Sequence, residues 1–427
     1  MLSLIDDEVS LYVEGKKFTS WKSVSISRAI DAAAGSFSLS AIEENSSILS
    51  DYELKPGAEC RVSIGGDTVI TGYIDDVKMS IDSGSFSLSV SGRDKTADLI
   101  DCSATGNSEF NNKTLTAIAQ ELCAPFGIAV LTDDGKDKQM SVRLNPKAAK
   151  SIAQSARRRK KKSSKFAGEV KKKFRTQPGE TVIECLERVA KEKGLLISST
   201  ANGELLLTRS NKEPSGATIV EGENLLSASI DTSIKDRFSK YIVNGQESGA
   251  VAASNRWRAF KYETSDLSIE RYRPLVILAE NAMGITGARR RAAWEATVRA
   301  AKSTSISAEV AEWRSDVGKL WTPNTIVRLK CPSLRVDREL LITEVNFEMS
   351  DSGRTTSLTL KRPDAFLLET DIVLPNNDPI KPKKIVKLPS KRKSIKPIRR
   401  TKRTPKPVSR SRGLVLNTAT TSGTETA

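Results

Sequence analysis

The residue types that most often carry out chemistry are either absent from this chain or spaced in ways that form no site. The 427 residues include no histidine, which excludes Ser-His-Asp and Cys-His catalysis and histidine-ligated metals. Adjacent carboxylates occur at Asp75-Asp76 and Asp133-Asp134, but neighbours in a strand or turn cannot face each other across a cleft as glycoside hydrolysis requires. Gly65-Gly66-Asp67 is typical of a turn, because no helix with a Lys-Ser/Thr pair follows it. The sequence predicts no catalytic residues and no enzyme.

The cysteines give no metal or redox motif. There are five, widely spaced and without a C-x-x-C pair, so four thiolates could meet only through the fold. Free cysteine behaves as a small hydrophobic residue, and we expect buried or half-buried thiols with no metal and no cofactor. The residues are Cys60, Cys102, Cys123, Cys185 and Cys331.

A predicted hairpin with a polar corner organises the first part of the chain. Phe86, Leu88 and Val90 alternate with serines, a period of two that indicates a half-buried strand. The turn at 82–84 predicts pairing of this strand with residues 73–79. After Gly92 the pattern becomes a short helical turn. There Arg93, Asp94 and Asp98 are expected to form a local salt bridge and a helix N-cap, with an interface role as the alternative.

The rest of the chain divides by periodicity into a mainly β protein with α/β insertions. Residues 1–101 predict a first small β-barrel, because several short alternating strands are separated by turns. Residues 102–222 predict an α/β module with helices near 115–123 and 182–190 and a basic insertion at 147–175. Residues 223–370 predict a second barrel with a helix at 288–302 and a loop at 249–266. A second Asp-Ser-Gly turn at 351–353 repeats the first hairpin and suggests two related tube-like barrels.

Charge is concentrated in two segments. Residues 147–175 hold 13 Lys and Arg against one acid, and residues 381–412 hold 15 and no acid. The formal net charge of +16 therefore leaves the remainder at −11, so an acidic body carries two basic segments. Residues 371–427 are rich in proline and lack periodicity, which predicts an extended, disordered tail. No run of eighteen apolar residues and no signal-peptide pattern occurs, and we expect cytoplasmic synthesis and no membrane span.

Seven short stretches in order resemble the baseplate hub proteins of Mu-like contractile-tailed phages, a tail hub family related to the T4 hub and to type VI secretion spike-hub proteins. The basic insertion and the basic tail depart from that family pattern. The stretches are 18–25, 72–101, 122–127, 222–226, 236–241, 271–275 and 320–324. The residues carrying the resemblance are Trp21, Gly72, Tyr73, Ile74, Asp75, Gly92, Arg93, Asp94, Asp98, Arg237, Tyr272, Pro274 and Trp321.

The resemblance implies a homotrimeric, pseudo-sixfold ring between a hexameric tail tube and a trimeric central spike, with a role in tail assembly and genome ejection. It places the protein in the virion tail baseplate after assembly in the host cytoplasm. The implied partners are further copies of the chain, the tail tube protein, the spike protein, other baseplate proteins and, as a further candidate, the tape-measure protein. Thiol oxidation in the mature particle stays open.

The strongest alternative is a basic nucleic-acid-binding adaptor. Two Lys/Arg blocks could neutralise phosphates with strong salt dependence. The blocks hold few aromatic residues for base stacking, so direct DNA binding is not expected. Contact with acidic protein partners is the preferred role of the basic clusters. They comprise Arg157, Arg158, Arg159, Lys160, Lys161, Lys162, Lys391, Arg392, Lys393, Arg399 and Arg400.

Overall fold

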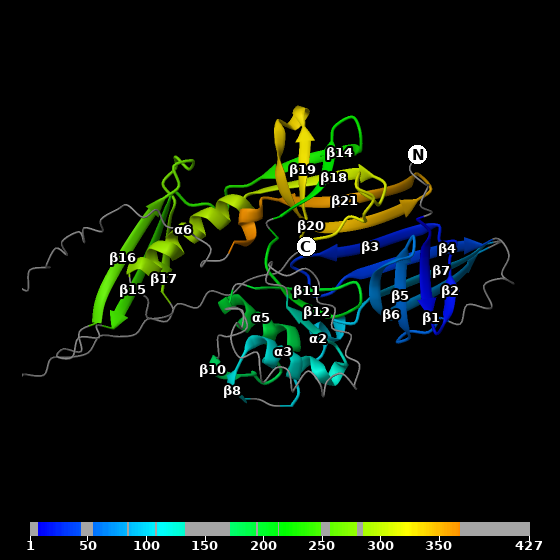
Figure 1. Ribbon diagram of the computed structural model, residues 1–427, viewed down its shortest axis with the longest axis horizontal. Coiled ribbons are helices and arrows are strands. Elements are labelled where there is room, and N and C mark those ends of the chain that lie inside the picture. The colour runs from blue at the N-terminus through cyan, green and yellow to red at the C-terminus, as the bar shows by residue number, and fades with distance from the viewer. Residues whose placement is uncertain are drawn as a thin grey trace, which may run out of the picture. The chain divides into compact units, whose positions relative to one another are not determined.

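The computed structural model describes residues 7–43, 54–82, 85–106, 109–132, 171–193, 195–211, 213–248, 257–279 and 285–367 (Figure 1). Every described residue belongs to the compact unit Met1–Leu374. The predicted tail and the basic clusters at 157–162, 391–393 and 399–400 lie outside the described residues.

Residues 7–94 form the first β unit, whose strands follow the predicted alternation. Val24 and Ile26 of one strand and Leu88 and Val90 of another are at most 2% exposed, while the serines between them face away from the core. The strands are β1 (Val9–Val13), β2 (Lys16–Phe18), β3 (Ser23–Ala29), β4 (Ser36–Glu43), β5 (Glu59–Ile64), β6 (Asp67–Asp82) and β7 (Ser85–Asp94).

The α/β module follows and contains the first two predicted helices. Thr114 caps α3 by accepting a hydrogen bond from the Ala117 N–H. Thr181 and Glu184 bond each other's backbone N–H groups at the start of α5, a capping box. The elements are α2 (Ala97–Asp101), β8 (Glu109–Lys113), α3 (Leu115–Cys123), η1 (Ala124–Phe126), β9 (Val130–Thr132), β10 (Lys171–Arg175), α5 (Val182–Lys193), β11 (Leu196–Ser199) and β12 (Leu205–Thr208).

The second β unit begins at residue 213 and contains the predicted third helix. One expectation for this region is wrong: the predicted loop contains strand β16, which pairs along its whole length with β15. The elements are β13 (Pro214–Val220), β14 (Leu225–Thr232), β15 (Lys240–Ser248), β16 (Trp257–Ser265), β17 (Pro274–Leu278), α6 (Ile285–Lys302), β18 (Thr304–Ala311), β19 (Ile326–Cys331), η2 (Pro332–Leu334), β20 (Val336–Ser350), β21 (Gly353–Lys361) and η3 (Pro363–Phe366).

One thirteen-stranded sheet runs through both β units. Its main path is β14-β18-β21-β20-β3-β4-β7-β6-β5-β1-β2, with β19 bridging β20 and β13 off that path. Because the path begins at β14 and ends at β2 without pairing them, the described residues contain no closed barrel. The prediction of two small barrels is therefore corrected to two β units sharing one open sheet.

Both predicted hairpins are present with the same strand register, although their Asp-Ser-Gly triplets stand one residue apart relative to the closing pair. The first hairpin pairs β6 with β7 and closes at Asp82↔Ser85, and the second pairs β20 with β21 and closes at Ser350↔Gly353. Each long strand also has a bulge at the same distance from its turn, at Asp75 in β6 and at Thr343 in β20. The repeat therefore extends to the irregularities of the backbone.

The β units and the module bury separate cores. The largest cluster joins residues of both β units, from Leu11 and Ile26 to Phe347 and Leu360. The module packs α3 and α5 against β11 and β12 around residues such as Ile118 and Leu186. Apolar contacts also join the module to the β units, because Ala33 packs against the module core and Leu196 packs against Ile30, Ile326 and Leu341. Polar side chains make several further contacts.

Candidate assembly site at the corner of the first β unit

Two glycines allow the strands of the first hairpin to approach closely. A Cβ on Gly72 would lie 1.9 Å from the Arg93 carbonyl oxygen, and a Cβ on Gly92 would lie 2.2 Å from the Tyr73 carbonyl oxygen. The Phe37 ring closes the remaining space beside Gly92, 2.7 Å from such a Cβ. Neither glycine has a positive φ. Close backbone approach, not left-handed geometry, therefore requires glycine at both positions.

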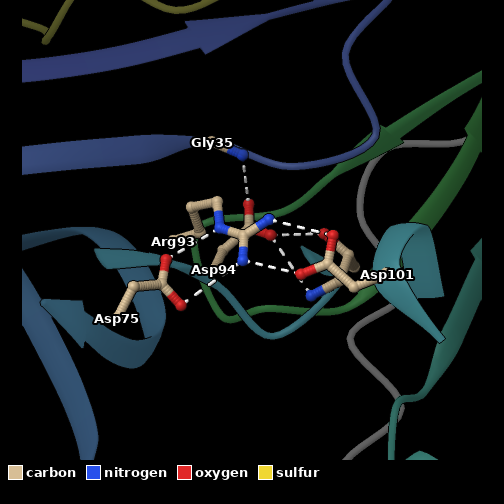
Figure 2. Close-up of polar contacts among 6 residues, drawn as sticks. Gly35, Asp75, Arg93, Asp94 and Asp101 are labelled. Atoms are coloured by element: carbon tan, nitrogen blue, oxygen red, sulfur yellow. Dashed lines mark hydrogen bonds and ion pairs between the residues drawn. The ribbon is translucent and has the colours of Figure 1, made fainter. Parts of the chain in front are cut away.

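Arg93 joins the bulge of β6 to helix α2 (Figure 2). Its guanidinium donates through Nε to Asp75 Oδ2 at 2.7 Å and through Nη2 to Asp101 Oδ2 at 2.7 Å. These hydrogen bonds lower the pKa of Asp101 and raise that of Arg93. All three side chains are at least one third exposed, so each pair contributes at most about 1 kcal/mol. Arg93 therefore forms a salt bridge at the corner as predicted, but with Asp75 and Asp101 in place of the expected Asp94 and Asp98.

Asp94, the next residue, points into the protein. It is 1% exposed, and its carboxylate accepts hydrogen bonds from the Gly35 N–H at 2.7 Å and the Thr96 N–H at 3.2 Å. The Thr96 and Ser199 hydroxyls donate to the same carboxylate. One side chain therefore ties together the β3–β4 connection, the start of α2 and strand β11 of the module.

Burial and nearby charge shift the pKa of Asp94 in opposite directions. Burial raises the pKa of this carboxyl, and the hydrogen bonds and the nearby Arg28 partly oppose that shift. Arg28 is half-buried, and its Nη2 donates to the Ser199 carbonyl oxygen at 2.8 Å. Burial in turn lowers the pKa of Arg28. The arrangement is a hydrogen-bonded joint between the first β unit and the module.

The backbone adds further contacts to this joint. The Lys95 N–H donates to the Thr71 carbonyl at 3.1 Å, and the Ser198 hydroxyl donates to the Ala29 carbonyl at 3.1 Å. Gly203, with φ +77°, packs so closely that a Cβ there would lie 2.6 Å from the Thr71 oxygen. The β11–β12 turn therefore fits against the corner through backbone contacts as well as through Asp94.

The expected helix N-cap differs from the observed one. Thr96 is the N-cap of α2, and no side chain makes the capping hydrogen bond to the helix. Asp98 lies in the first turn, where desolvation and the charge of Asp101 raise its pKa. Ile74 is 1% exposed, and Tyr73 is half-buried in the same strand. The corner therefore combines an exposed ion pair with a buried polar joint.

The remaining residues of the family pattern lie elsewhere. Arg237 donates to Asp266 Oδ2 at 2.7 Å and bonds Ser268, which fixes the loop before β15. Pro274 begins β17, and Tyr272 beside it is 76% exposed. Trp21 and Trp321 are about 5% exposed at most, and each indole N–H lacks a hydrogen-bond partner among the described residues. Both tryptophans belong to the large core.

A second polar joint was not predicted. Arg314, before β19, forms ion pairs with Asp7 at 2.7 Å and Asp67 at 2.9 Å. The Arg314 and Asp7 side chains are 13% and 9% exposed. Because the partners lie about three hundred residues apart, no local pattern indicates this pair.

The thiols and carboxylates of the described residues form no metal-binding cluster. Among the described residues, no group of three or more His, Cys, Asp or Glu side chains could hold a metal ion. Cys60, Cys123, Cys185 and Cys331 are buried and Cys102 is exposed. Burial raises the pKa of Cys60 and Cys123 to about 12, which keeps both thiols protonated and unreactive at neutral pH. In the described part of the chain, no helix has both the length and the apolar character needed to cross a membrane.

Comparison with known proteins supports a tail function. A model of the Mu phage baseplate assembly protein GpP-like N-terminal domain matches residues 8–94. A model of the second domain of gp44-like baseplate hub proteins matches 96–161 and 159–209, and one of the fourth domain of Mu phage GpP matches 285–369.

Full-length relatives agree with the domain matches. The baseplate hub protein gp44 of Escherichia phage Mu is 33% identical over 379 residues, 86% of this chain and 91% of that protein. The crystal structure of the prophage MuSo2 43 kDa tail protein from Shewanella oneidensis has a TM-score of 0.68 at 33% identity, covering 84% of this chain and 99% of the other. A tail protein from Neisseria meningitidis MC58 shares the fold, with a TM-score of 0.65 at 23% identity over 84% and 98% of the two chains.

These matches confirm the resemblance carried by the sequence motifs, and with it the prediction that the chain is not an enzyme: it belongs to the family of Mu-like phage baseplate hub proteins, structural components of the tail baseplate.

Proposed function

We propose that three copies of this chain form a closed ring joining the hexameric tail tube to the trimeric central spike of a contractile tail. The observation that carries the proposal is the repeat of the two hairpins, with matched turns and matched bulges. A ring of three chains with two similar β units each presents six similar units to a sixfold partner while keeping threefold symmetry for the spike. Such a ring surrounds a passage for genome ejection.

The four predicted segments have separate roles in this proposal. Residues 1–101 and 223–370 supply most of the repeated ring units, and residues 102–222 supply most of a module attached through the Asp94 joint. Helix α2 packs with the module, and strand β13 pairs with β19 of the second unit. Assembly takes place in the host cytoplasm, before the ring is incorporated into the virion. The family-pattern residues at the corner, from Gly72 to Asp98, keep the hairpin and the module in a fixed relation so that the ring surface is reproducible.

The basic segments 147–175 and 381–412 are partner-binding arms, except that Lys171–Arg175 of the first segment form strand β10 and pair with β8 within the module. With 12 and 15 net positive charges against −11 for the rest of the chain, they suit acidic surfaces of the tube, the spike, the tape-measure protein or other baseplate proteins. Many weak charge contacts add up to a binding energy that falls as salt is raised.

The oligomeric state tests the ring directly. Size-exclusion chromatography with light scattering should give three times the 46.6 kDa chain mass at micromolar concentration. Negative-stain images should show a ring. A monomer or a twofold dimer would contradict the proposal.

Deletion of residues 381–412 separates the arms from the ring. The shortened chain should keep its threefold mass but lose salt-sensitive binding to purified tube or spike protein. Unchanged binding at low and high salt would show that this arm does not hold partners. A strong salt-dependent shift of duplex DNA by the full chain but not by the deletion would favour the nucleic-acid-binding alternative.

A further inference from the structure

The two β units of one chain meet through a single strand pair. Residues 344–349 of β20 pair antiparallel with β3 of the first unit, with Phe347 opposite Ile26 and Met349 opposite Val24. The preceding half of the same β20 edge pairs with β19. One edge of β20 therefore pairs first with β19 and then with β3, and β3 belongs to the other β unit.

Strand β6 is the counterpart of β20 in the first unit, but its corresponding edge is only half used. The first half of that edge pairs with β5 from Asp67 to Tyr73. From Asp76 to Ile81, β6 pairs only with β7 on its other side, as far as the described residues show. Met79 and Ile81 in this stretch are 50% and 77% exposed. An unpaired strand edge with exposed apolar side chains is suited to pairing with another strand.

Strand β14 is the counterpart of β3 in the second unit. Gly92 pairs with Phe37 and Phe37 with Ile26, as Leu360 pairs with Ile306 and Ile306 with Ile230. β14 ends the sheet, and in the described structure residues 227–232 pair only with β18. Among the described residues, β6 and β14 thus each leave unpaired the kind of edge that β20 and β3 use to pair with each other.

The register of the β20–β3 pairing can be applied to these two edges, with β6 in place of β20 and β14 in place of β3. It then gives a specific set of residue pairs. The apolar face of β6 meets the less polar face of β14, as Val77 opposite Thr232, Met79 opposite Ile230 and Ile81 opposite Ala228. The other face brings Asp76 opposite Ser233, Lys78 opposite Asp231 and Ser80 opposite Ser229. Lys78 and Asp231 are both exposed. Backbone pairing alone fixes this register, so the two apolar pairs, Met79–Ile230 and Ile81–Ala228, and the Lys78–Asp231 pair of opposite charge are independent support.

We propose that residues 76–81 of β6 in one copy pair antiparallel with residues 228–233 of β14 in the next copy, in this register. The inference rests on the proposed ring and supplies its contact. Because the two edges differ, the contact is head-to-tail, and head-to-tail contacts close into rings when the rotation permits. The sheet then continues from chain to chain, and both unused edges are covered.

Cysteine pairs test the register. In a Cys102→Ser background, which leaves the buried native thiols, one chain carries Met79→Cys and a co-expressed chain carries Ile230→Cys. Oxidation should link the two chains, because facing residues lie within disulfide distance. Each single variant alone should remain unlinked. Ser80→Cys with Ile230→Cys is the control, since these side chains point to opposite faces of the sheet. Equal linking in the control, or linking of one variant to itself, would overturn the proposal.

A charge exchange tests the same contact without altering apolar residues. Lys78→Glu or Asp231→Lys should each raise the concentration needed for half assembly by about tenfold, because a like-charge pair then recurs at every contact of the ring. The combined variant should restore assembly. Lys319→Glu, at an exposed lysine outside both edges, should leave assembly unchanged.

The outcomes separate this inference from the ring itself. A threefold mass without the Met79–Ile230 link and without a charge response would overturn the strand pairing and leave the ring standing. A monomeric native chain would overturn both. Linked chains with charge rescue would establish the pairing.

Discussion

The two hairpins have the same backbone pairing pattern and differ in the side chains that pack around it. Residues Ile74–Gly92 of the first correspond to Ile342–Leu360 of the second, through the turns and bulges that they have in common. Gly92 takes the position that Leu360 occupies, and Phe37 takes that of Ile306. The Phe37 ring lies where a Gly92 side chain would be. The first unit therefore fills this space with the large Phe37 beside Gly92, whereas the second unit fills it with two residues of similar size, Ile306 and Leu360.

The bulges show a second difference. Asp75, at the bulge of β6, is exposed and forms an ion pair with Arg93. Thr343, at the bulge of β20, is 3% exposed; its hydroxyl donates to the Thr359 carbonyl, and its own carbonyl accepts from the Ile30 N–H of the first unit. The same backbone irregularity therefore serves an exposed corner in one unit and a buried contact between units in the other.

The largest expected effect comes from removing the glycine that distinguishes the first hairpin. Gly92→Val should cost about 4 kcal/mol or more and leave little folded protein, because its Cβ would meet the Tyr73 carbonyl as well as the Phe37 ring. Leu360→Val at the corresponding position should cost about 1 kcal/mol. Thermal unfolding and soluble yield measure both. Similar losses in the two variants would show that the hairpins do not differ in this way.

Local patterns predicted the elements that local sequence determines. Alternation and the two Asp-Ser-Gly turns predicted both hairpins, and apolar spacing predicted α3, α5 and α6. Glycine at 72 and 92 fits either a positive φ or a close backbone approach, and the distances show close approach. The loop predicted at 249–266 hides β16, although Phe260, Tyr262 and Thr264 alternate there with charged residues as strand residues do.

Contacts between distant segments could not be predicted in the same way. Asp94 is adjacent to Arg93 in a polar stretch, yet one side chain is buried and the other exposed because their partners differ. Gly35 and Ser199 lie 59 and 105 residues away. Barrel closure likewise depends on which edges meet, and alternation within a strand carries no information about its neighbours. The interface role of the family-pattern residues remains a prediction.

An intermediate effect is expected at Asp94, the last residue of β7, whose counterpart in the second unit is Arg362. Asp94→Asn should cost about 2–4 kcal/mol, because a single amide oxygen cannot accept all of the donors that meet this carboxylate, and the amide adds a donor among them. Hydrogen exchange should increase first in β11 and β12. The corresponding Arg362→Gln removes only an exposed ion pair with Asp364 and should cost less than about 1 kcal/mol. Equal effects of the two substitutions would mean that Asp94 is not a joint.

The smallest expected effect depends on pH and concerns the ion pair of the first corner. Arg93 lowers the pKa of Asp101, so this carboxyl stabilises the fold above its unfolded pKa of about 3.9, and the contribution is lost as the pH falls through the lower folded pKa. Arg93→Gln should therefore lower stability by about 0.5–1 kcal/mol at pH 7, a range limited by solvent screening, and the difference from the native chain should vanish near pH 2. Added salt should shrink the difference at pH 7.

Arg93→Lys should retain part of the effect because it keeps the charge without the planar donors. Lys361→Gln, at the matching position of the second hairpin, should show no such dependence, since Lys361 forms no ion pair within the described structure. Melting temperatures of the four chains at pH 2, 4 and 7 measure the effect, and a loss on Arg93→Gln that is the same at every pH would contradict the linkage between Arg93 and Asp101.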